Sequence, residues 1–327
     1  MIGRYRKFAM TSVRRRALLA AVPAVALFGR SALSQSTKIT LGSGSEGGGF
    51  AADASAFTDA MRAIDPTFEI RVTATKGTVQ NVPMLEAGDL DIGLVLGEVA
   101  YELLHGIGRP LTKLKVISVM YSTPGMFIVR ADSRYRRITD LIGRKVVWNG
   151  RDSGLAVQAR YVMDGLGLDI DKDFEPIYID QLTEGPLMVL DGRAAALWGG
   201  GVRWPGFVKV ASSTRGGRFV VPTSSEIQRI HDKHSFLTRL TVPAGLYPGQ
   251  YDAIDTVGAW SFIMARADLD DAIGHRLAAS LYKIERAGSL SRQLSETTAK
   301  NTLAAIPGPE VLQPGIARFY KEVELLK

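Results

Sequence analysis

After Lys38 the sequence alternates short apolar runs with longer amphipathic stretches, and this alternation constrains the fold more than any other feature. Apolar runs bounded by glycine and polar residues predict strands, and the stretches between them have helical spacing. Strands that alternate with helices are typical of α/β architecture. The predicted strands are 39–41, 68–73, 91–96, 116–129, 145–148, one near Ile177, 194–198, 219–221 and 255–265. The predicted helices are 51–64, 81–87, 98–104, 155–166, 182–190, 206–212, 270–286 and 314–326.

Two such α/β series follow one another along the chain, which predicts two lobes. Pro124 and Gly125 break the apolar run 116–129, and the segment Pro243–Gly249, PAGLYPG, is rich in turn residues. Because proline and glycine interrupt regular structure, we expect the chain to cross between the lobes at these two places. The predicted lobes are 35–124 together with 250–327, and 125–249.

The first 34 residues are typical of a targeting segment and are left out of the predicted fold. They contain seven basic and no acidic side chains, and an apolar run of 12 residues, 17–28, precedes small residues before Gln35. Because a bilayer span takes roughly 20 apolar residues, we expect a signal peptide cleaved near Ser34/Gln35 and a periplasmic mature protein. Arg15-Arg16 resembles a twin-arginine export signal, and Arg14 leaves a general secretory signal open.

Charge and cysteine content exclude several classes of protein. The chain has 40 basic and 33 acidic residues, and without its first 34 residues it has 33 of each. A nucleic-acid-binding protein normally presents a concentrated basic face, so we expect no nucleic acid partner. The sequence has no cysteine, which excludes disulfides, cysteine zinc sites and thiol catalysis. Common metal and catalytic motifs are absent from the sequence, and we expect no metal and no cofactor.

A glycine-rich loop, Gly42–Phe50, joins a predicted strand to a predicted helix with the sequence GSGSEGGGF. Its glycines let backbone N–H groups approach a ligand, the helix start is a positive dipole end, and Ser43 and Ser45 add hydroxyls. These features predict a site for an anionic or strongly polar group. The loop also contains GxGxxG, so a dinucleotide site is an alternative, although Glu69 lies at the wrong end of the second strand for a ribose contact. A tight turn without a ligand is a third interpretation.

Three more loops join strands to helices in the same way: Thr75–Asn81, Asn149–Gly154 and Gly199–Gly206. Pro83 favours a helix cap near Asn81, which would leave Thr75 and Thr78 free to face a ligand, and plain capping is the alternative. Trp204 lies beside Pro205 in a glycine loop, and we expect it to face the cleft. Because ligands of α/β sheets bind at the carboxyl ends of strands, the four loops are predicted to surround one cleft.

At these loops the sequence resembles the TAXI proteins, the extracytoplasmic solute receptors of one class of TRAP transporters. The resemblance covers nearly the whole chain after residue 38. It rests on ITLGSGSEGGGF from Ile39, TKGTVQNVPMLEAGDLDIGLV from Thr75, DLIGRKVVWNGRDSG from Asp140, LDGRAAALWGGGVRWPGFVKVAS from Leu190, VPAGLYPGQ from Val242 and PGIARFYKE from Pro314.

The resemblance implies an α/β fold of the periplasmic binding protein type II architecture, with two hinge-linked lobes and a central ligand cleft. It implies no catalysis. A monomeric receptor would bind a small organic acid or amino acid and deliver it to the membrane permease subunits of a TRAP transporter. The ligand-binding residues that the resemblance implies are Ser43, Ser45, Gly48, Thr75, Thr78, Asn81, Ser153 and Gly154, with Gly199 to Pro205, including Gly200 and Trp204, on the opposite side.

The sequence departs from the TAXI pattern at three loop positions, and also at Leu155, where the family commonly has threonine. Glu46 stands where the family usually has a small or hydroxyl residue, Lys76 where it has glycine, and Phe50 where it has tyrosine. We therefore add these three residues to the expected ligand site. Glu46 and Lys76 either form an ion pair at the cleft rim or contact a ligand that carries both charges. For the whole chain, a secreted dinucleotide-dependent oxidoreductase and a ligand-sensing surface protein are the alternatives.

Overall fold

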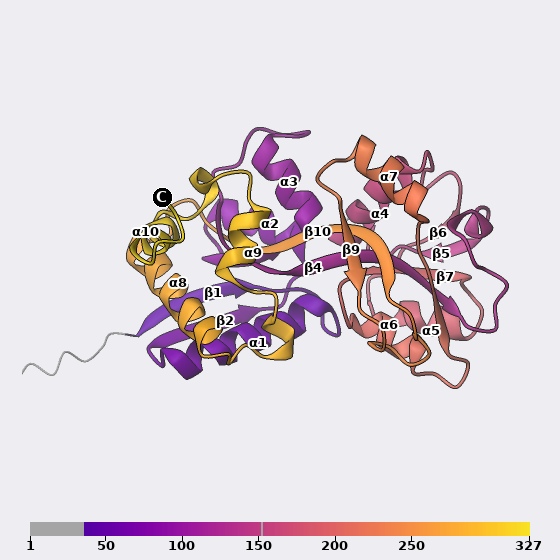
Figure 1. Cartoon of the computed structure of the whole chain (residues 1–327), viewed down its shortest axis with the longest axis horizontal. Coiled ribbons are helices and arrows are strands. Elements are labelled where there is room, and N and C mark those ends of the chain that lie inside the picture. The colour runs from indigo at the N-terminus through magenta and orange to yellow at the C-terminus, as the bar shows by residue number, and fades with distance from the viewer. Residues whose placement is uncertain (1–35, 152) are drawn as a thin grey trace, which may run out of the picture. The chain divides into compact units, whose positions relative to one another are not determined.

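One ten-stranded mixed sheet organises the residues that the computed structural model describes, 36–151 and 153–327 (Figure 1). Eight strands lie in the order β2-β1-β3-β10-β4-β7-β5-β6, and β8 pairs with β4 and β9 with β10. The strands are β1 (Thr37–Gly42), β2 (Phe68–Thr73), β3 (Ile92–Val95), β4 (Lys115–Arg130), β5 (Lys145–Val147), β6 (Glu175–Ile177), β7 (Ala196–Gly200), β8 (Gly217–Val220), β9 (Thr238–Val242) and β10 (Ile254–Ala265).

Helices connect these strands and cover the sheet. They are α1 (Gly49–Ile64), α2 (Thr78–Ala87), α3 (Gly97–His105), α4 (Gly154–Gly165), α5 (Glu184–Leu190), α6 (Pro205–Ala211), α7 (Ser224–Lys233), α8 (Asp271–Arg286), α9 (Ala299–Ala305) and α10 (Pro314–Glu322). Three short 3-10 helices are η1 (Ile138–Leu141), η2 (Arg292–Leu294) and η3 (Pro309–Val311). The predicted α/β class is confirmed, and every predicted strand and helix is present with small shifts at its ends. Strand β9 and helices α7 and α9 are not among the elements predicted above.

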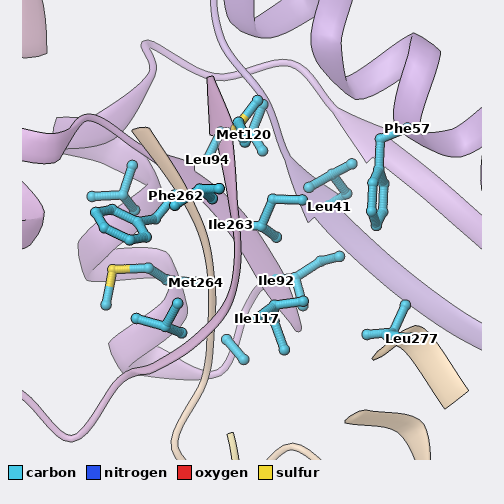
Figure 2. Close-up of a cluster of buried hydrophobic side chains, with 14 of the residues drawn as sticks. Leu41, Phe57, Ile92, Leu94, Ile117, Met120, Phe262, Ile263, Met264 and Leu277 are labelled. Carbon is cyan, nitrogen blue, oxygen red and sulfur yellow. The ribbon is translucent and has the colours of Figure 1, made fainter. Parts of the chain in front are cut away.

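A first hydrophobic core packs β1, β3 and parts of β4 and β10 against helices α1 and α8. All four residues of β3 are buried, as expected of a central strand that lies between β1 and β10 and is covered on both faces. Figure 2 shows Leu41, Ile92 and Ile263 gathered beside Phe57 of α1 and Leu277 of α8. Burial of each large apolar side chain contributes about 1.5–3 kcal/mol, so this core fixes the strand ends that carry the loops. We call the elements around this core the first lobe.

A second hydrophobic core occupies both faces of the other end of the sheet. Along β4, Phe127 and Val129 pack on one face, and Met126 and Ile128 pack on the other, as the two-residue period of a strand requires. Helices α4 and α7 cover the first of these faces, and α5 and α6 cover the second. We call these elements the second lobe, and β4 and β10 run through both lobes.

The predicted break of β4 at Pro124-Gly125 is wrong, because β4 is one 16-residue strand that pairs with β10 on both sides of Pro124. Pro124 lies opposite Gly258, where the missing side chain lets the two strands approach closely, and its carbonyl accepts a hydrogen bond from Gly201 N–H at 3.3 Å. The segment Pro243–Gly249 is not a crossing between lobes. It turns β9 back into β10, and Tyr247 packs in the second core.

The predicted signal peptide, residues 1–34, lies outside the described residues. Among the helices that the structure describes, none combines the length and the apolar character needed to cross a membrane.

Candidate functional site

A pocket of about 510 Å³ lies between the two lobes, at the carboxyl ends of the parallel strands. Its wall takes residues from the loops after β1, β2 and β3 in the first lobe and after β5, β6 and β7 in the second. Tyr121 and Thr123 of the crossing strand β4 complete the wall. The expectation that strand-to-helix loops from both lobes surround one cleft therefore agrees with the geometry.

Most of the residues expected at the ligand site lie in the wall of this pocket. They are Ser45, Gly48, Phe50, Lys76, Thr78, Ser153, Gly154, Gly200 and Trp204. Five others lie outside the wall, namely Ser43, Glu46, Thr75, Asn81 and Pro205. Pro205 opens helix α6 and is exposed, whereas Ser43, Thr75 and Asn81 are buried behind the loops.

Asn81 holds the first two loops together instead of facing the pocket. The predicted cap near Asn81 is wrong, because α2 begins at Thr78 and Asn81 lies inside the helix, fully buried. Its Nδ2 donates to the carbonyl oxygens of Ser43 and Leu94, both at 2.8 Å, and Thr75 Oγ1 donates to its Oδ1 at 2.8 Å. A buried amide with its partners satisfied in this way rigidifies the backbone around it. Asn81 therefore positions the loops after β1, β2 and β3.

The N-termini of three helices converge on the pocket. The wall contains Gly49 and Phe50 at the start of α1, Thr78 and Val79 at the start of α2, and Gly154 at the start of α4. The first N–H groups of a helix lack partners within the helix and carry its positive dipole end. Helices of 16, 10 and 12 residues thus direct N–H groups from both lobes toward one volume. This arrangement suits an anionic group.

The starts of α2 and α4 lie at contact distance across the pocket. A Cβ at Gly154 would lie 3.1 Å from Thr78 Oγ1 and 3.0 Å from Leu96 Cβ. Thr78 Oγ1 accepts a hydrogen bond from Leu96 N–H at 3.0 Å, and Ser153 Oγ accepts one from Ala156 N–H at 3.2 Å as the cap of α4. Ser153, which is expected as a ligand residue, therefore also caps α4, and each hydroxyl keeps lone-pair or donor capacity for a ligand.

The pocket wall also contains aromatic side chains and uncharged polar side chains. Phe50 and Trp204 contribute rings, and the half-buried Tyr121 and buried Thr123 contribute hydroxyls from β4. Thr123 Oγ1 lies 2.8 Å from Ser261 Oγ. Sequence reasoning misses Tyr121 and Thr123, because they belong to a long apolar strand that is typical of core.

Charged side chains occur in the wall only at exposed positions among the described residues, namely Lys76, Arg151 and Asp180. The Arg151 guanidinium stacks 4.0 Å from the Tyr178 ring centre, and its Nη1 lies 3.5 Å from Asp171 Oδ1. Within the part of the chain that is described, Glu46 and Lys76 form no ion pair with each other. Lys76 belongs to the pocket wall at an exposed position, while Glu46 lies outside the wall.

Behind Tyr121 lies the buried carboxyl of Asp53 on α1. Burial raises the pKa of Asp53 to about 7, and hydrogen bonds from Gln293 and Tyr121 only partly oppose this effect. Because Tyr121 lines the pocket, the hydrogen bond between Asp53 and Tyr121 connects this buried carboxyl to the pocket wall. In the described ranges, no group of three or more His, Asp or Glu side chains is placed to hold a metal ion.

The dinucleotide interpretation of GxGxxG is wrong for this fold. In the parallel pairing of β1 with β2, Glu69 lies opposite Lys38, and Thr73 lies opposite Gly42. Glu69 is therefore at the far end of β2 from the glycine loop, where it cannot reach a ribose. Strand β10 also runs antiparallel between β3 and β4, unlike the all-parallel dinucleotide sheet.

The mixed sheet, its two crossing strands and the pocket between the lobes define the fold of the periplasmic substrate-binding proteins. The solved structure of an ancestral arginine-binding protein bound to arginine matches with a TM-score of 0.51 and 11% identity, over 80% of this chain and 98% of that one. A structure from Listeria monocytogenes, provisionally named an L-cystine ABC transporter, matches with a TM-score of 0.51 and 16% identity, over 80% of this chain and 94% of that one. Residues 41–323 match the NMT1-like family model, and the chain belongs to that family.

Proposed function

We propose that this chain is an exported solute receptor that binds a small organic acid or amino acid in the pocket between its lobes. The convergence of the α1, α2 and α4 N-termini on one pocket carries the proposal. A carboxylate placed there accepts hydrogen bonds from backbone N–H groups and interacts favourably with three helix dipoles. Lys76 in the pocket wall adds a positive charge, which also favours an anionic ligand.

The two lobes would form a hinged pair, with the hinge in the middle of β4 and β10. The division into 35–124 with 250–327 and 125–249 is part of this proposal, with the second boundary moved into β10 because Val257 and Ala259 pack in the second core. Each lobe supplies only some of the polar groups of the wall, so a ligand makes its full set of contacts only when both lobes surround it. That difference in contacts is what shifts an equilibrium between open and closed forms.

The partner proposed is a membrane permease of the TRAP type, in line with the resemblance to TAXI proteins, and the receptor acts as a monomer. Comparable folds in ABC transporter proteins make the ABC type the alternative partner. Uptake into vesicles that contain the permease distinguishes them. A TRAP permease accumulates the ligand on an ion gradient alone, and an ABC permease requires ATP.

A thermal-shift screen of carboxylates, amino acids and sulfonates tests the binding function. A ligand present at 100 times its dissociation constant adds about 2.7 kcal/mol of stability, which is a readily measured shift. We expect at least one carboxylate or amino acid to stabilise the wild type and to lose most of this effect in Thr78→Ala. Tyr251→Ala, at an exposed tyrosine outside the pocket, serves as the matched control. Stabilisation by none of these compounds, or equal stabilisation of Thr78→Ala, would contradict the proposal.

A further inference from the structure

A buried acid–amide pair links the two lobes beside the pocket. Glu98 lies in the first turn of α3, Gln158 lies in α4, and neither side chain is exposed to solvent. Gln158 Nε2 donates to Glu98 Oε1 at 2.9 Å and to the Thr123 carbonyl at 2.8 Å. Because α3 belongs to the first lobe and α4 to the second, this pair exists only when the lobes meet.

Two oxygen atoms of this pair are left without a hydrogen-bond partner. Glu98 Oε2 and Gln158 Oε1 are both buried, and neither has a partner among the described residues. With Glu98 ionised, both atoms are acceptors only, so neither can satisfy the other. Buried polar atoms are rarely left unpaired, because each one costs the desolvation of that group. A proton on Glu98 Oε2 would turn that oxygen into a donor, and Gln158 Oε1 has the free lone pairs to accept it.

The surroundings of Glu98 favour its neutral form. The titratable neighbours are Glu102 and Tyr101 on its own helix and Tyr161 on α4, whose hydroxyl lies 2.7 Å from Glu102 Oε1. The neighbouring strands contribute uncharged backbone carbonyl groups, that of Trp260 from β10 beside Gly97 and that of Thr123 from β4 beside Gln158. Burial, with a smaller contribution from the Glu102 charge, raises the pKa of Glu98 to about 7, and hydrogen bonds from its own backbone N–H and from Gln158 only partly oppose this effect.

We propose that Glu98 is a neutral carboxylic acid that donates its proton to Gln158 Oε1, and that closure of the lobes takes up this proton. The second part rests on the proposed function, since it requires lobes that open and expose Glu98 to water. The open form would then have the ordinary carboxyl pKa of 4.5 and the closed form one of about 7. Between pH 4.5 and about pH 7, the equilibrium constant for closure falls by up to about tenfold for each unit of rising pH. Below and above this range it does not depend on the pH.

The protonation state is tested without any ligand, by infrared difference spectroscopy of the full chain against Glu98→Gln. Glutamine is neutral and has an N–H that can donate to Gln158 Oε1, so this variant keeps the pair and removes the acid. Glu102→Gln is the matched control on the same helix. At pH 6 we expect a carboxylic acid carbonyl band in the difference between the wild type and Glu98→Gln, and none in the difference between the wild type and Glu102→Gln. The band of the buried Asp53, whose pKa is also raised to about 7, is common to all three proteins and cancels. Equal bands in the wild type and Glu98→Gln would overturn the assignment.

The link to closure is tested by the distance between spin labels on the two lobes. The sequence has no cysteine, so Asp59→Cys on α1 and Lys209→Cys on α6, both at exposed positions, are labelled uniquely. We expect the short-distance population to grow between pH 7.5 and pH 5 in the wild type and in Glu102→Gln, and to stay constant in Glu98→Gln. The same pH response in Glu98→Gln as in the wild type, or no response in the wild type, would overturn proton-linked closure. Because no ligand is used, a failure here is distinct from a failure of the ligand screen.

Discussion

Gly154→Ala changes the starts of α2 and α4 where the lobes meet. The added Cβ would lie 3.0 Å from Leu96 Cβ, 3.1 Å from Thr78 Oγ1 and 3.3 Å from Leu96 Cδ1. Carbon atoms are at their optimal separation at about 3.5–4.0 Å, so the two lobes must separate by several tenths of an ångström. Overpacking of this kind typically costs about 1–3 kcal/mol. We expect ligand affinity to fall by about 5- to 150-fold, which corresponds to this range.

The same substitution should not destabilise a protein whose lobes are open. Gly154 is the first residue of α4 and does not have a positive φ, so alanine fits the backbone and gains about 0.4–1 kcal/mol by restricting the unfolded chain. Calorimetric titration with the ligand found by the screen and thermal unfolding without ligand separate the two effects. Gly150→Ala is the matched control in the same loop, since its Cβ would lie no closer than 3.6 Å to any neighbour. Unchanged affinity in Gly154→Ala would refute the claim that these loops close on the ligand.

Three further predictions concern single side chains of the site. Ser153→Ala removes the cap of α4 and should lower stability by about 0.5–2 kcal/mol in thermal unfolding, besides weakening the ligand; an unchanged melting temperature would contradict the cap. Lys76→Met should lower the affinity for a carboxylate ligand in calorimetry, while Glu46→Gln should leave the affinity unchanged, because only Lys76 lies in the pocket wall. Equal effects of the two variants would favour the alternative, an ion pair between these residues at the cleft rim. Burial raises the pKa of Asp53 from 3.8 to about 7, so its neutral form stabilises the fold fully below pH 4 and this contribution is lost as the pH rises to 7. Asp53→Asn should reduce the fall in unfolding free energy between pH 4 and pH 7, measured with denaturant, by a few kcal/mol at most. The same dependence on pH as in the wild type would count against a raised pKa of Asp53.

Much of the fold follows from local sequence pattern, and the errors arise where tertiary contacts override it. The apolar run 116–129 shows a strand, but Pro124-Gly125 predicts a break that does not occur. The close approach of Gly258 and the hydrogen bond from Gly201 decide this position, and both residues are distant in sequence. Strand β9 is missed because its residues are mostly exposed or half-buried, so it lacks the apolar alternation of a strand that packs on a core.

The candidate site was predictable as a set of loops, but not as a set of side chains. Glycine and hydroxyl residues after each strand mark the loops that line the pocket. Their sequence does not tell whether a polar side chain faces a ligand or holds the backbone, as Asn81 and Ser153 show. Tyr121 and Thr123 could not be predicted as site residues, because the sequence of a buried strand does not show which of its side chains line a cavity.

A crystal structure of the chain with the ligand identified by the screen tests the central claim most directly. We expect ligand density in the pocket between the lobes, with an anionic group at roughly 2.7–3.2 Å from backbone N–H groups at the start of α2 or α4. A ligand bound elsewhere, as in the groove beside Arg218 and Tyr251 of the second lobe, would contradict it. An anionic group that avoids all three helix N-termini would contradict it as well.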